Sequence, residues 1–452
     1  MALQAVTSGG QTVTKVAAGS SHSLFLKSDG SLWAMGDNGY GQLGDGTTDN
    51  DNYNTNLPEQ IVAGNVTAIA AGAYHSLFLK SDGSLWVMGD NGNGQLGDGI
   101  TTELFNYNNA TNLPEQIVAS DVTAIAAGGS HSLFLKSNGS LWAMGNNASG
   151  QLGDGTYNQT NLPEQIMASD VTAIAAGGYH SLFLKSDGSL WAMGYNASGQ
   201  LGLGIINKTN RPTQIVANNV TAIAAGWTYS LFLKSDGSLW AMGYNEYGQL
   251  GDSTYNQTNR PEQIVANNVT AIAAGGGHSL FLKSDGSLWA MGDNYDGQLG
   301  DGTTDNDNYN TNWPEQIVAT NVTAIAAGGS HSLFLKSDGS LWAMGYNGSG
   351  QLGDGTTDGD TYTTNQPEQI VAGLNVPPGY NQISVHLLSG GKMRLSFVGF
   401  AGTNYALDRS FRLSPVNWVP QVTNPADVDG ALVITNTPNP TTNNFWRIRS
   451  VP

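Results

Sequence analysis

Six of the seven histidines occupy one position of an internal repeat, where they could serve as metal ligands. Each follows an Ala-Ala-Gly stretch and two variable residues. They are His22, His75, His131, His180, His278 and His331. A zinc site needs three or four converging ligands, whereas equivalent positions of neighbouring repeats lie apart on a ring. We therefore expect the imidazoles to hydrogen-bond to backbone in a structural role, and we expect no metal site.

Glycine-rich segments match the dinucleotide-binding pattern Gly-x-Gly-x-x-Gly in three repeats, beginning at Gly39, Gly92 and Gly348. That pattern needs a following helix to hold a pyrophosphate. Here a turn of the Asp-Gly-Thr type follows, and the segment simply recurs with the repeat. We therefore expect no nucleotide and no other cofactor.

Carboxylates recur in the loops that follow Gly-Gln-Leu-Gly. The three sets are Asp45, Asp49 and Asp51; Asp301, Asp305 and Asp307; and Asp354, Asp358 and Asp360. Calcium loops of the best-known type carry Gly at position six and Glu at position twelve. Counting from Asp49, those positions hold Asn54 and Gln60. We interpret the sets as solvated turns, with calcium binding as the alternative.

The sequence contains no Gly-x-Ser-x-Gly elbow, no His-Glu-x-x-His motif and no non-repeated histidine near a candidate nucleophile. These motifs are typical of the common hydrolases and metalloproteases. We therefore predict no catalytic residue and a protein that is not an enzyme.

A unit of about 50 residues recurs seven times, marked by tryptophans spaced 49 to 56 residues apart. Each unit offers four short apolar segments of the types Val-Thr-Ala-Ile-Ala, Leu-Phe-Leu, Leu-Trp-Ala-Met and Gln-Ile-Val. Asp-Gly between the second and third indicates a hairpin. A period near 50 is typical of propellers, and apolar runs without alternation indicate strands covered on both faces. We predict an all-β fold, a seven-bladed β-propeller of four-stranded blades over residues 1–373.

The ends of the repeat region suggest how the ring closes. The repeats start with Val13–Val16 and end with Pro367–Val371, and the corresponding segments are adjacent elsewhere, as in Gln60–Thr67. We expect the last strand to pair with the first and so to clasp the ring.

Residues 374–380 are predicted to be a linker because Pro377, Pro378 and Gly379 interrupt the pattern. Residues 381–452 lack the repeat and are predicted to form a small β-sandwich. They carry six Lys and Arg against three Asp, a net charge of +3, whereas the whole chain carries −18. Two parts of opposite charge indicate two domains with different partners.

The repeat resembles the regulator of chromosome condensation family. The shared signature is Gly-x-x-His-Ser, an Asp-Gly turn, and Asn-x-x-Gly-Gln-Leu-Gly, and it extends over residues 13 to about 373. One departure is the Ala-Met pair between Trp and Gly. The resemblance implies a seven-bladed propeller but no single function, because members of the family differ in function. Secreted bacterial members are closest in character, so the resemblance also implies binding to a protein.

Two residues vary between Ala-Ala-Gly and His-Ser, at a rim where one strand passes to the next. In the resembling proteins, aromatic residues at these positions contact the partner, and exposed Trp and Tyr favour interfaces. Repeat five also carries Tyr in place of His. The predicted partner-binding residues are Tyr74, Tyr179, Trp227 and Tyr229. The alternative is that they pack on neighbouring loops. Repeat four departs at Leu203–Ile206, in a different loop that we expect to lie apart from this group.

The composition narrows the partners. A net charge of −18 argues against nucleic acid, and no apolar run approaches the ~20 residues of a membrane span. The chain has no cysteine, which fits bacterial export, although no signal peptide is visible at its start. We predict a secreted or cell-surface binding scaffold that presents propeller loops to a protein partner. The alternatives are an adhesin for carbohydrate or other surface glycan, an enzyme such as a lyase, and a designed or recently amplified scaffold.

Overall fold

The computed structural model describes residues 11–48, 55–100, 111–304, 311–357 and 363–373, together with the backbone of six strands after residue 382. The chain forms two compact units, residues 1–373 and 374–452. Within the described ranges, no helix is long and apolar enough to cross a lipid bilayer.

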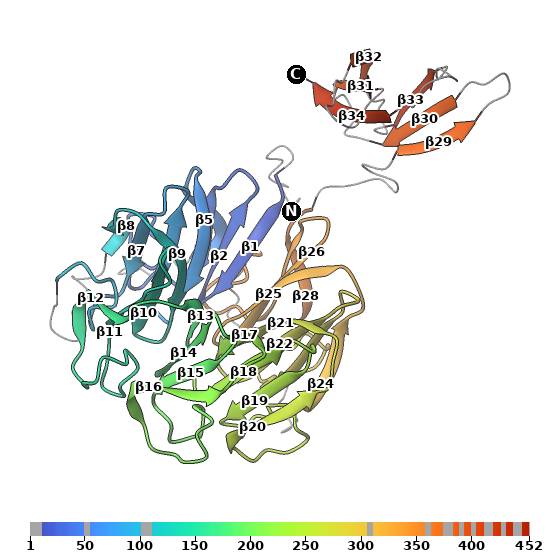
Figure 1. Ribbon diagram of the computed structural model, residues 1–452. Helices are drawn as coiled ribbons and strands as arrows, with labels where there is room; N and C mark the ends of the chain where they lie inside the picture. The colour runs from blue at the N-terminus through green and yellow to red at the C-terminus, as the bar shows by residue number, and fades with distance from the viewer. Residues whose placement is uncertain are drawn as a thin grey trace. The chain divides into compact units, whose positions relative to one another are not determined.

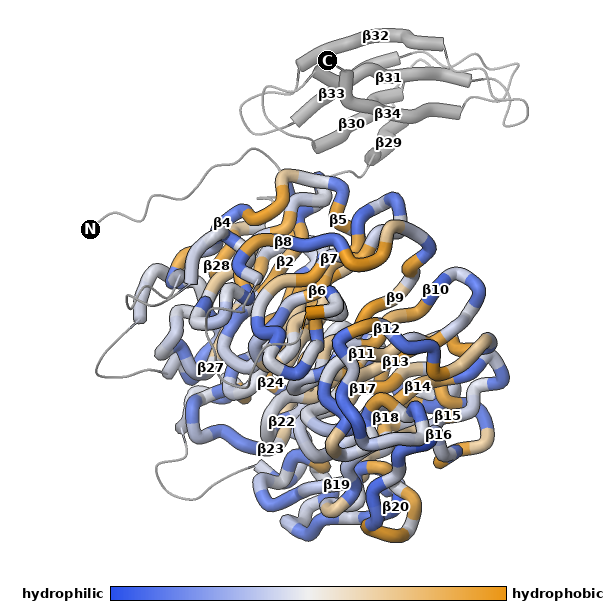
Figure 2. Tube along the Cα trace, turned by 90° about the vertical axis from the view of Figure 1, so that its left-hand side faces the viewer, coloured by the Kyte–Doolittle hydropathy of each residue, from blue (hydrophilic) through white to orange (hydrophobic). Residues whose placement is uncertain are grey.

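The first unit is a seven-bladed β-propeller, as the repeat predicts (Figure 1). Each blade is a four-stranded antiparallel sheet whose strands follow one another in the sequence, from the innermost to the outermost. In Figure 2 the inner strands β9, β13 and β18 are mostly orange, whereas the outer strands β12, β16 and β20 carry blue stretches.

The strands of the first three blades have the following bounds. Blade 1 contains β1 (Val13–Ala18), β2 (His22–Lys27), β3 (Leu32–Gly36) and β4 (Thr55–Val62). Blade 2 contains β5 (Val66–Ala71), β6 (His75–Lys80), β7 (Leu85–Gly89) and β8 (Thr111–Val118). Blade 3 contains β9 (Val122–Ala127), β10 (His131–Lys136), β11 (Leu141–Gly145) and β12 (Thr160–Met167).

The other four blades repeat the same order. Blade 4 contains β13 (Val171–Ala176), β14 (His180–Lys185), β15 (Leu190–Gly194) and β16 (Thr209–Val216). Blade 5 contains β17 (Val220–Ala225), β18 (Tyr229–Lys234), β19 (Leu239–Gly243) and β20 (Thr258–Val265). Blade 6 contains β21 (Val269–Ala274), β22 (His278–Lys283), β23 (Leu288–Gly292) and β24 (Thr311–Val318). Blade 7 contains β25 (Val322–Ala327), β26 (His331–Lys336), β27 (Leu341–Tyr346) and β28 (Thr363–Val371).

The core lies between the blades, because each blade is too thin to bury its own side chains. On β2, Leu24 and Leu26 pack in a cluster with blade 2, whereas Phe25 packs in a cluster with blade 7. Alternate side chains of one strand therefore enter two different seams. This arrangement explains why the apolar runs are continuous rather than alternating.

The predicted Asp-Gly hairpin is confirmed between the second and third strands. In blade 1, Gly30 adopts a φ of 77°, which suits glycine. The Asp29 carboxylate accepts hydrogen bonds from the Ser31 backbone N–H at 2.9 Å and from the Ser31 hydroxyl at 2.7 Å. The Ser31 hydroxyl in turn accepts the indole N–H of Trp33 at 2.9 Å. The turn thus fixes the tryptophan of the third strand.

The prediction that the last strand of the repeats pairs with the first is wrong. β28 pairs with β27, and β1 pairs with β2, so blades 1 and 7 are each built from one continuous segment. The ring closes instead by the contacts that join every other pair of blades. The Val13 backbone N–H donates to the Gly339 carbonyl at 3.1 Å, as Val66 does to Gly30 at 3.0 Å. The adjacency of the two segments in the sequence reflects a link from an outermost strand to the next innermost strand.

The second unit contains two three-stranded antiparallel sheets. One has the order β29-β30-β33 and the other β32-β31-β34. The strands are β29 (Ile383–Leu387), β30 (Met393–Val398), β31 (Asn404–Ser410), β32 (Val419–Pro425), β33 (Ala431–Asn436) and β34 (Phe445–Val451). β32 contains two prolines, which are unusual inside a sheet. The predicted linker 374–380 lies outside the described residues.

The closing seam should be as strong as an interior seam. Phe25→Ala opens the seam between blades 7 and 1, and Phe134→Ala opens the seam between blades 2 and 3. Both phenylalanines are essentially fully buried, so each truncation should cost about 3 to 5 kcal/mol of unfolding free energy. Denaturant unfolding monitored by tryptophan fluorescence measures both. A much smaller loss for Phe25→Ala would show that the closing seam is loosely packed.

Candidate functional site

Three of the four predicted binding residues, Tyr74, Tyr179 and Trp227, lie on one face of the propeller. β2 runs back from the turn 19–21, and Gly36 at the end of β3 pairs with His22 and with Thr55 at the start of β4. The β1–β2 turns and the β3–β4 loops of all blades therefore share one face, here called the channel face. The Asp-Gly turns and the links between blades lie on the opposite face, here called the turn face.

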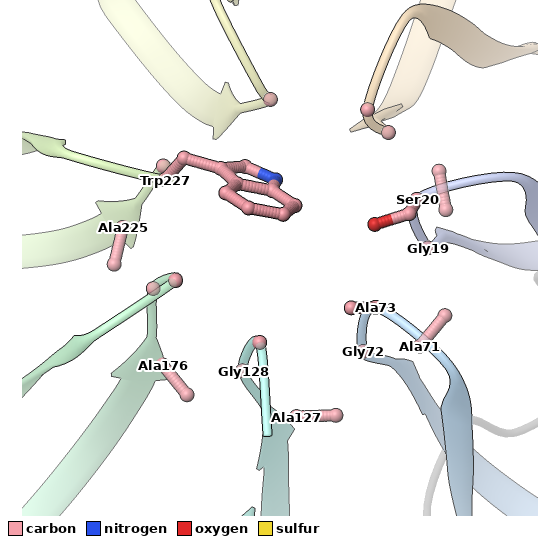
Figure 3. Close-up of a pocket in the computed structure, with 18 of the residues that line it drawn as sticks. Gly19, Ser20, Ala71, Gly72, Ala73, Ala127, Gly128, Ala176, Ala225 and Trp227 are labelled. Carbon is pink, nitrogen blue, oxygen red and sulfur yellow. The ribbon is translucent and has the colours of Figure 1, made fainter. Parts of the chain in front are cut away.

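The channel face surrounds a small opening on the propeller axis, about 70 Å³ in volume. Its wall is made by the Ala-Gly ends of the innermost strands, which approach closely because they carry little side chain (Figure 3). A backbone hydrogen bond joins each blade to the next, from Ser20 N–H to the Gly72 carbonyl at 3.3 Å through to Gly329 N–H and the Gly19 carbonyl at 3.0 Å. The Trp227 indole extends from blade 5 into this opening, toward the side that carries Ser20 (Figure 3).

Trp227 belongs to a group of aromatic rings in mutual contact. The ring of Tyr179 meets Trp227 edge-on with centroids 6.3 Å apart, and meets Tyr195 in the same way at 6.2 Å. Tyr179 is 45% exposed and Trp227 is 37% exposed. Tyr74, 38% exposed, forms a separate pair with Tyr40, with centroids 5.0 Å apart. The structure thus brings Tyr179 and Trp227 together, leaves Tyr74 in another blade, and keeps all three accessible.

The repeat histidines bridge the blades beneath this face. In blade 1, Nε2 of His22 lies 2.9 Å from the Ser76 hydroxyl of blade 2. That hydroxyl donates its hydrogen to the Gln42 carbonyl at 2.8 Å, so it accepts one from the imidazole. The prediction of a structural role fits this geometry, but the imidazole partner is a serine side chain rather than backbone. The same pair of hydrogen bonds joins blade 7 to blade 1. Nε2 of His331 bonds to the Ser23 hydroxyl, and that hydroxyl donates to the Gln351 carbonyl.

This geometry explains the residues around each histidine. A Cβ atom at Gly19 would overlap the His22 ring, so the turn requires glycine. The imidazole is fully buried, and its Nδ1 has no hydrogen-bond partner among the described residues. Burial lowers the pKa of His22 to about 3 and that of His75 to about 4, so both rings are neutral at physiological pH. These histidines therefore act in packing and not in proton transfer.

The repeat architecture identifies the family. The model of the RCC1-like domain matches this sequence over residues 2–216 and 64–395, which together span most of the chain. The chain belongs to the RCC1-like domain family.

Several known proteins share this RCC1-like region. The probable E3 ubiquitin-protein ligase HERC4 of Homo sapiens is 34% identical over 143 residues, which cover 31% of this chain and 13% of the ligase. Protein RCC2 homolog of Xenopus laevis is 37% identical over 158 residues, which cover 33% of this chain and 29% of that protein. The chain therefore matches less than a third of the length of either relative.

Solved structures agree with the RCC1-like fold. Human WBSCR16 is similar with a TM-score of 0.65 and 25% identity, covering 76% of this chain and 95% of that one. Prp20p of Saccharomyces cerevisiae has a TM-score of 0.67 and 22% identity, covering 80% of this chain and 90% of that one.

Tyr229 does not belong to the predicted surface of the RCC1-like propeller. Its side chain is fully buried. The phenol donates to the His278 carbonyl and accepts a hydrogen bond from Gly275 N–H at 3.1 Å. Its oxygen also lies 3.1 Å from the Ser279 hydroxyl, which donates to the Gln249 carbonyl at 2.7 Å. The longer tyrosine thus reaches the serine of the next blade, as histidine does elsewhere. The substitution is a structural replacement, and its side chain is not accessible to a partner.

The acidic loops fix their own backbone where the structure describes them. Asp45 accepts hydrogen bonds from Asn38 at 3.0 Å and from the Thr47 backbone N–H at 2.8 Å. Asp301 and Asp354 make the equivalent bonds. The remaining carboxylates of the predicted sets, Asp49, Asp51, Asp305, Asp307, Asp358 and Asp360, lie outside the described residues. Across the described ranges, no group of three or more acidic, histidine or cysteine side chains could hold a metal ion.

Sequence reasoning missed further aromatic residues of the channel face. They lie in the β3–β4 loops beside the repeat asparagine and are Tyr195, Tyr244, Tyr247 and Tyr295. Tyr295 is 65% exposed. The signal was present, because these positions also vary between repeats. The departure at Leu203–Ile206 lies in the β3–β4 loop of blade 4, so it shares the channel face and is not on the opposite one.

Acid should destabilise the propeller through its histidines. The unfolded-state pKa of histidine is about 6.5, and in the folded state His22, His131, His180 and His331 titrate at about 3 and His75 and His278 at about 4. Between these values the unfolded chain binds more protons, so stability falls as the pH is lowered below about 6.5. The expected loss is about 2 kcal/mol per histidine at pH 5.

Denaturant unfolding at pH 7.5, 6 and 5 measures this dependence. His278→Tyr, which copies the arrangement of blade 5, removes one of the six histidines and should make the dependence correspondingly shallower. An identical pH dependence in the variant would contradict the assignment.

Tyr229 offers a second test of the bridge. Tyr229→Phe removes the hydroxyl and its hydrogen bond to the His278 carbonyl. Gly275 N–H still donates to the His278 carbonyl and the Ser279 hydroxyl still donates to the Gln249 carbonyl, so the loss should be about 0.5 to 1.5 kcal/mol. Tyr229→His restores the repeat residue and should cost less than Tyr229→Phe. Thermal melting distinguishes them, and equal melting temperatures for the wild type and Tyr229→Phe would show that the hydroxyl contributes nothing.

Proposed function

We propose that this RCC1-like propeller is a non-enzymatic scaffold that binds a partner protein through its channel face. The observation that carries the proposal is a contiguous group of three aromatic rings. Tyr179 and Trp227 are exposed, Tyr195 beside them is half-buried, and Trp227 lines the central opening. These rings occupy positions that vary between repeats, whereas the residues beneath them are nearly constant. A constant framework with variable exposed loops is the usual design of a binding surface.

The chemistry of these side chains favours a protein partner. Trp and Tyr offer large, rigid contact areas with a polar group at one end, and they dominate the binding energy of many interfaces. Trp227 keeps more than a third of its surface exposed. An exposed tryptophan in the centre of a face gains free energy when a partner covers it.

Proteins of this fold provide a parallel. The yeast propeller Prp20p was characterised for its binding to Gsp1p and histones. The relation to the HERC4 ligase covers 13% of that protein, so a ligase activity is not part of the proposal. The partner of this chain is therefore proposed by class only, as a protein.

Trp227→Ala should weaken partner binding about thirtyfold, since loss of an interface anchor typically costs ~2 kcal/mol or more. The full chain is used to capture proteins from the native host, and the affinity of the enriched partner is then measured by calorimetry. Trp313→Ala is the matched control, because Trp313 is 53% exposed on the outer strand β24, away from the central opening. It should change the affinity less than twofold.

Unchanged melting temperatures in both variants establish that the fold is intact. If Trp227→Ala lowers the melting temperature and leaves binding unaltered, Trp227 is a packing residue and the face is assigned wrongly. A wild-type protein that binds glycans on an array, with Trp227→Ala abolishing that binding, would favour the adhesin alternative instead.

A further inference from the structure

Acidic side chains outnumber basic ones on the channel face of blades 5 to 7. Each blade has one lysine at the end of its second strand, on the turn face, and in all seven blades its ammonium lies over the tryptophan ring, as Lys234 does at 3.9 Å from Trp240. The channel-face segments of blades 5 to 7 contain no Lys or Arg; they are residues 244–257, 293–304 and 346–357 together with the turns before the second strands. Negative charge on this part of the channel face is therefore not balanced locally.

Between blades 5 and 6, the ring of Tyr247 and the side chain of Asp293 lie on either side of Gly277, which forms the base of the site. A Cβ atom at Gly277 would lie 3.1 Å from the Tyr247 ring and 3.2 Å from Cβ of Asp293. Both side chains therefore stand beside a position that carries no side chain of its own. Tyr247 is 41% exposed and meets Tyr244 edge-on, with centroids 5.9 Å apart, so its ring is held in place and accessible.

A second carboxylate lies close to the first. Asp296 follows Asp293 in the same β3–β4 loop, hydrogen-bonds to Ser330 of blade 7, and is repelled by the Asp293 charge. Partial burial raises the pKa of both carboxyl groups. Two partly desolvated carboxylates beside each other gain free energy when a cation neutralises them.

We infer that the site formed by Tyr247, Gly277, Asp293 and Asp296 binds a lysine or arginine side chain of the partner protein. This inference rests on the proposed function, because the site lies on the channel face that the partner would cover. The carboxylates pair with the cation, and the Tyr247 ring adds a cation–π contact. The glycine floor leaves room for the incoming side chain, which a Cβ atom would narrow.

The other repeats show why the site is specific to these blades. In blade 2 the equivalent aspartate, Asp90, accepts hydrogen bonds from Gly92 N–H at 2.9 Å and from the Gln95 amide at 2.7 Å. Asp293 is held in the same way, by Tyr295 N–H at 3.1 Å and by the Gln298 side chain. The two aspartates therefore differ in their surroundings and not in their own hydrogen bonds. The surroundings differ, because blade 2 carries Tyr74 in place of Gly277 and the neutral Asn93 in place of Asp296. Asp90 therefore provides the same charge at the same repeat position without the site.

The probe is a dye-labelled peptide, acetyl-Gly-Arg-Gly-Arg-Gly, whose control replaces each arginine with the neutral isostere citrulline. Its binding to the full chain is measured by fluorescence anisotropy at low and high salt. Asp293→Asn and Asp296→Asn should each weaken binding at least tenfold, Tyr247→Leu at least threefold, and Asp90→Asn less than twofold. The citrulline peptide should bind at least tenfold more weakly, and salt should weaken the arginine peptide alone.

Equal losses for Asp90→Asn and Asp293→Asn would overturn the inference, because they would show that binding responds only to net charge. No binding of the arginine peptide to the wild type would overturn it as well. In either case the proposed function still stands if Trp227→Ala abolishes partner binding, and it fails independently if Trp227→Ala leaves partner binding unchanged.

Discussion

The propeller depends on a buried hydrogen bond between each blade and the next. The imidazole of one blade donates to a serine of its neighbour, and that serine donates to a glutamine carbonyl in the loop of the first blade. The histidine, serine and glutamine that make these hydrogen bonds are fully buried. A missing partner would therefore leave an uncompensated polar group in the interior. The requirement explains why Gly, His and Ser recur together. It also explains Tyr229, the one replacement, since its phenol reaches the same serine.

Most of the fold could be predicted from the sequence because its signals are local and repeated. Apolar segments, Asp-Gly turns and a constant period are sufficient to place four strands in each of seven blades. Ring closure could not be predicted in the same way. Adjacent segments such as Gln60–Thr67 are equally compatible with pairing and with a link between blades, and only the register of β28 on β27 decides. β32 is also difficult to predict from the sequence, because prolines are rare inside sheets.

The candidate site, like the fold, could be predicted only in part from the sequence. The exposure of Tyr74, Tyr179 and Trp227 could be predicted because they lie in a turn whose place in the blade is known from the repeat. Tyr229 also departs from the repeat, but its burial could not be inferred from the exposed Trp227 close to it in the sequence. Its side chain is buried because it reaches between blades 5 and 6 and bonds to the His278 carbonyl. Tyr247 and Asp293 come together across two blades, and only the distances to Gly277 show it. A repeat therefore reveals which positions vary, whereas the space between the blades determines which of them face solvent.

The continuity of each blade has an evolutionary and topological consequence. Since blades 1 and 7 meet through the same kinds of contact as any other pair, the ring has no privileged junction. A gene rearranged to begin at any link between an outermost and an innermost strand would encode the same set of seams. Unequal crossing-over between such similar repeats would remove or add whole blades without leaving half of one behind. In a propeller clasped by strands from both ends of the chain, the same events would split a blade.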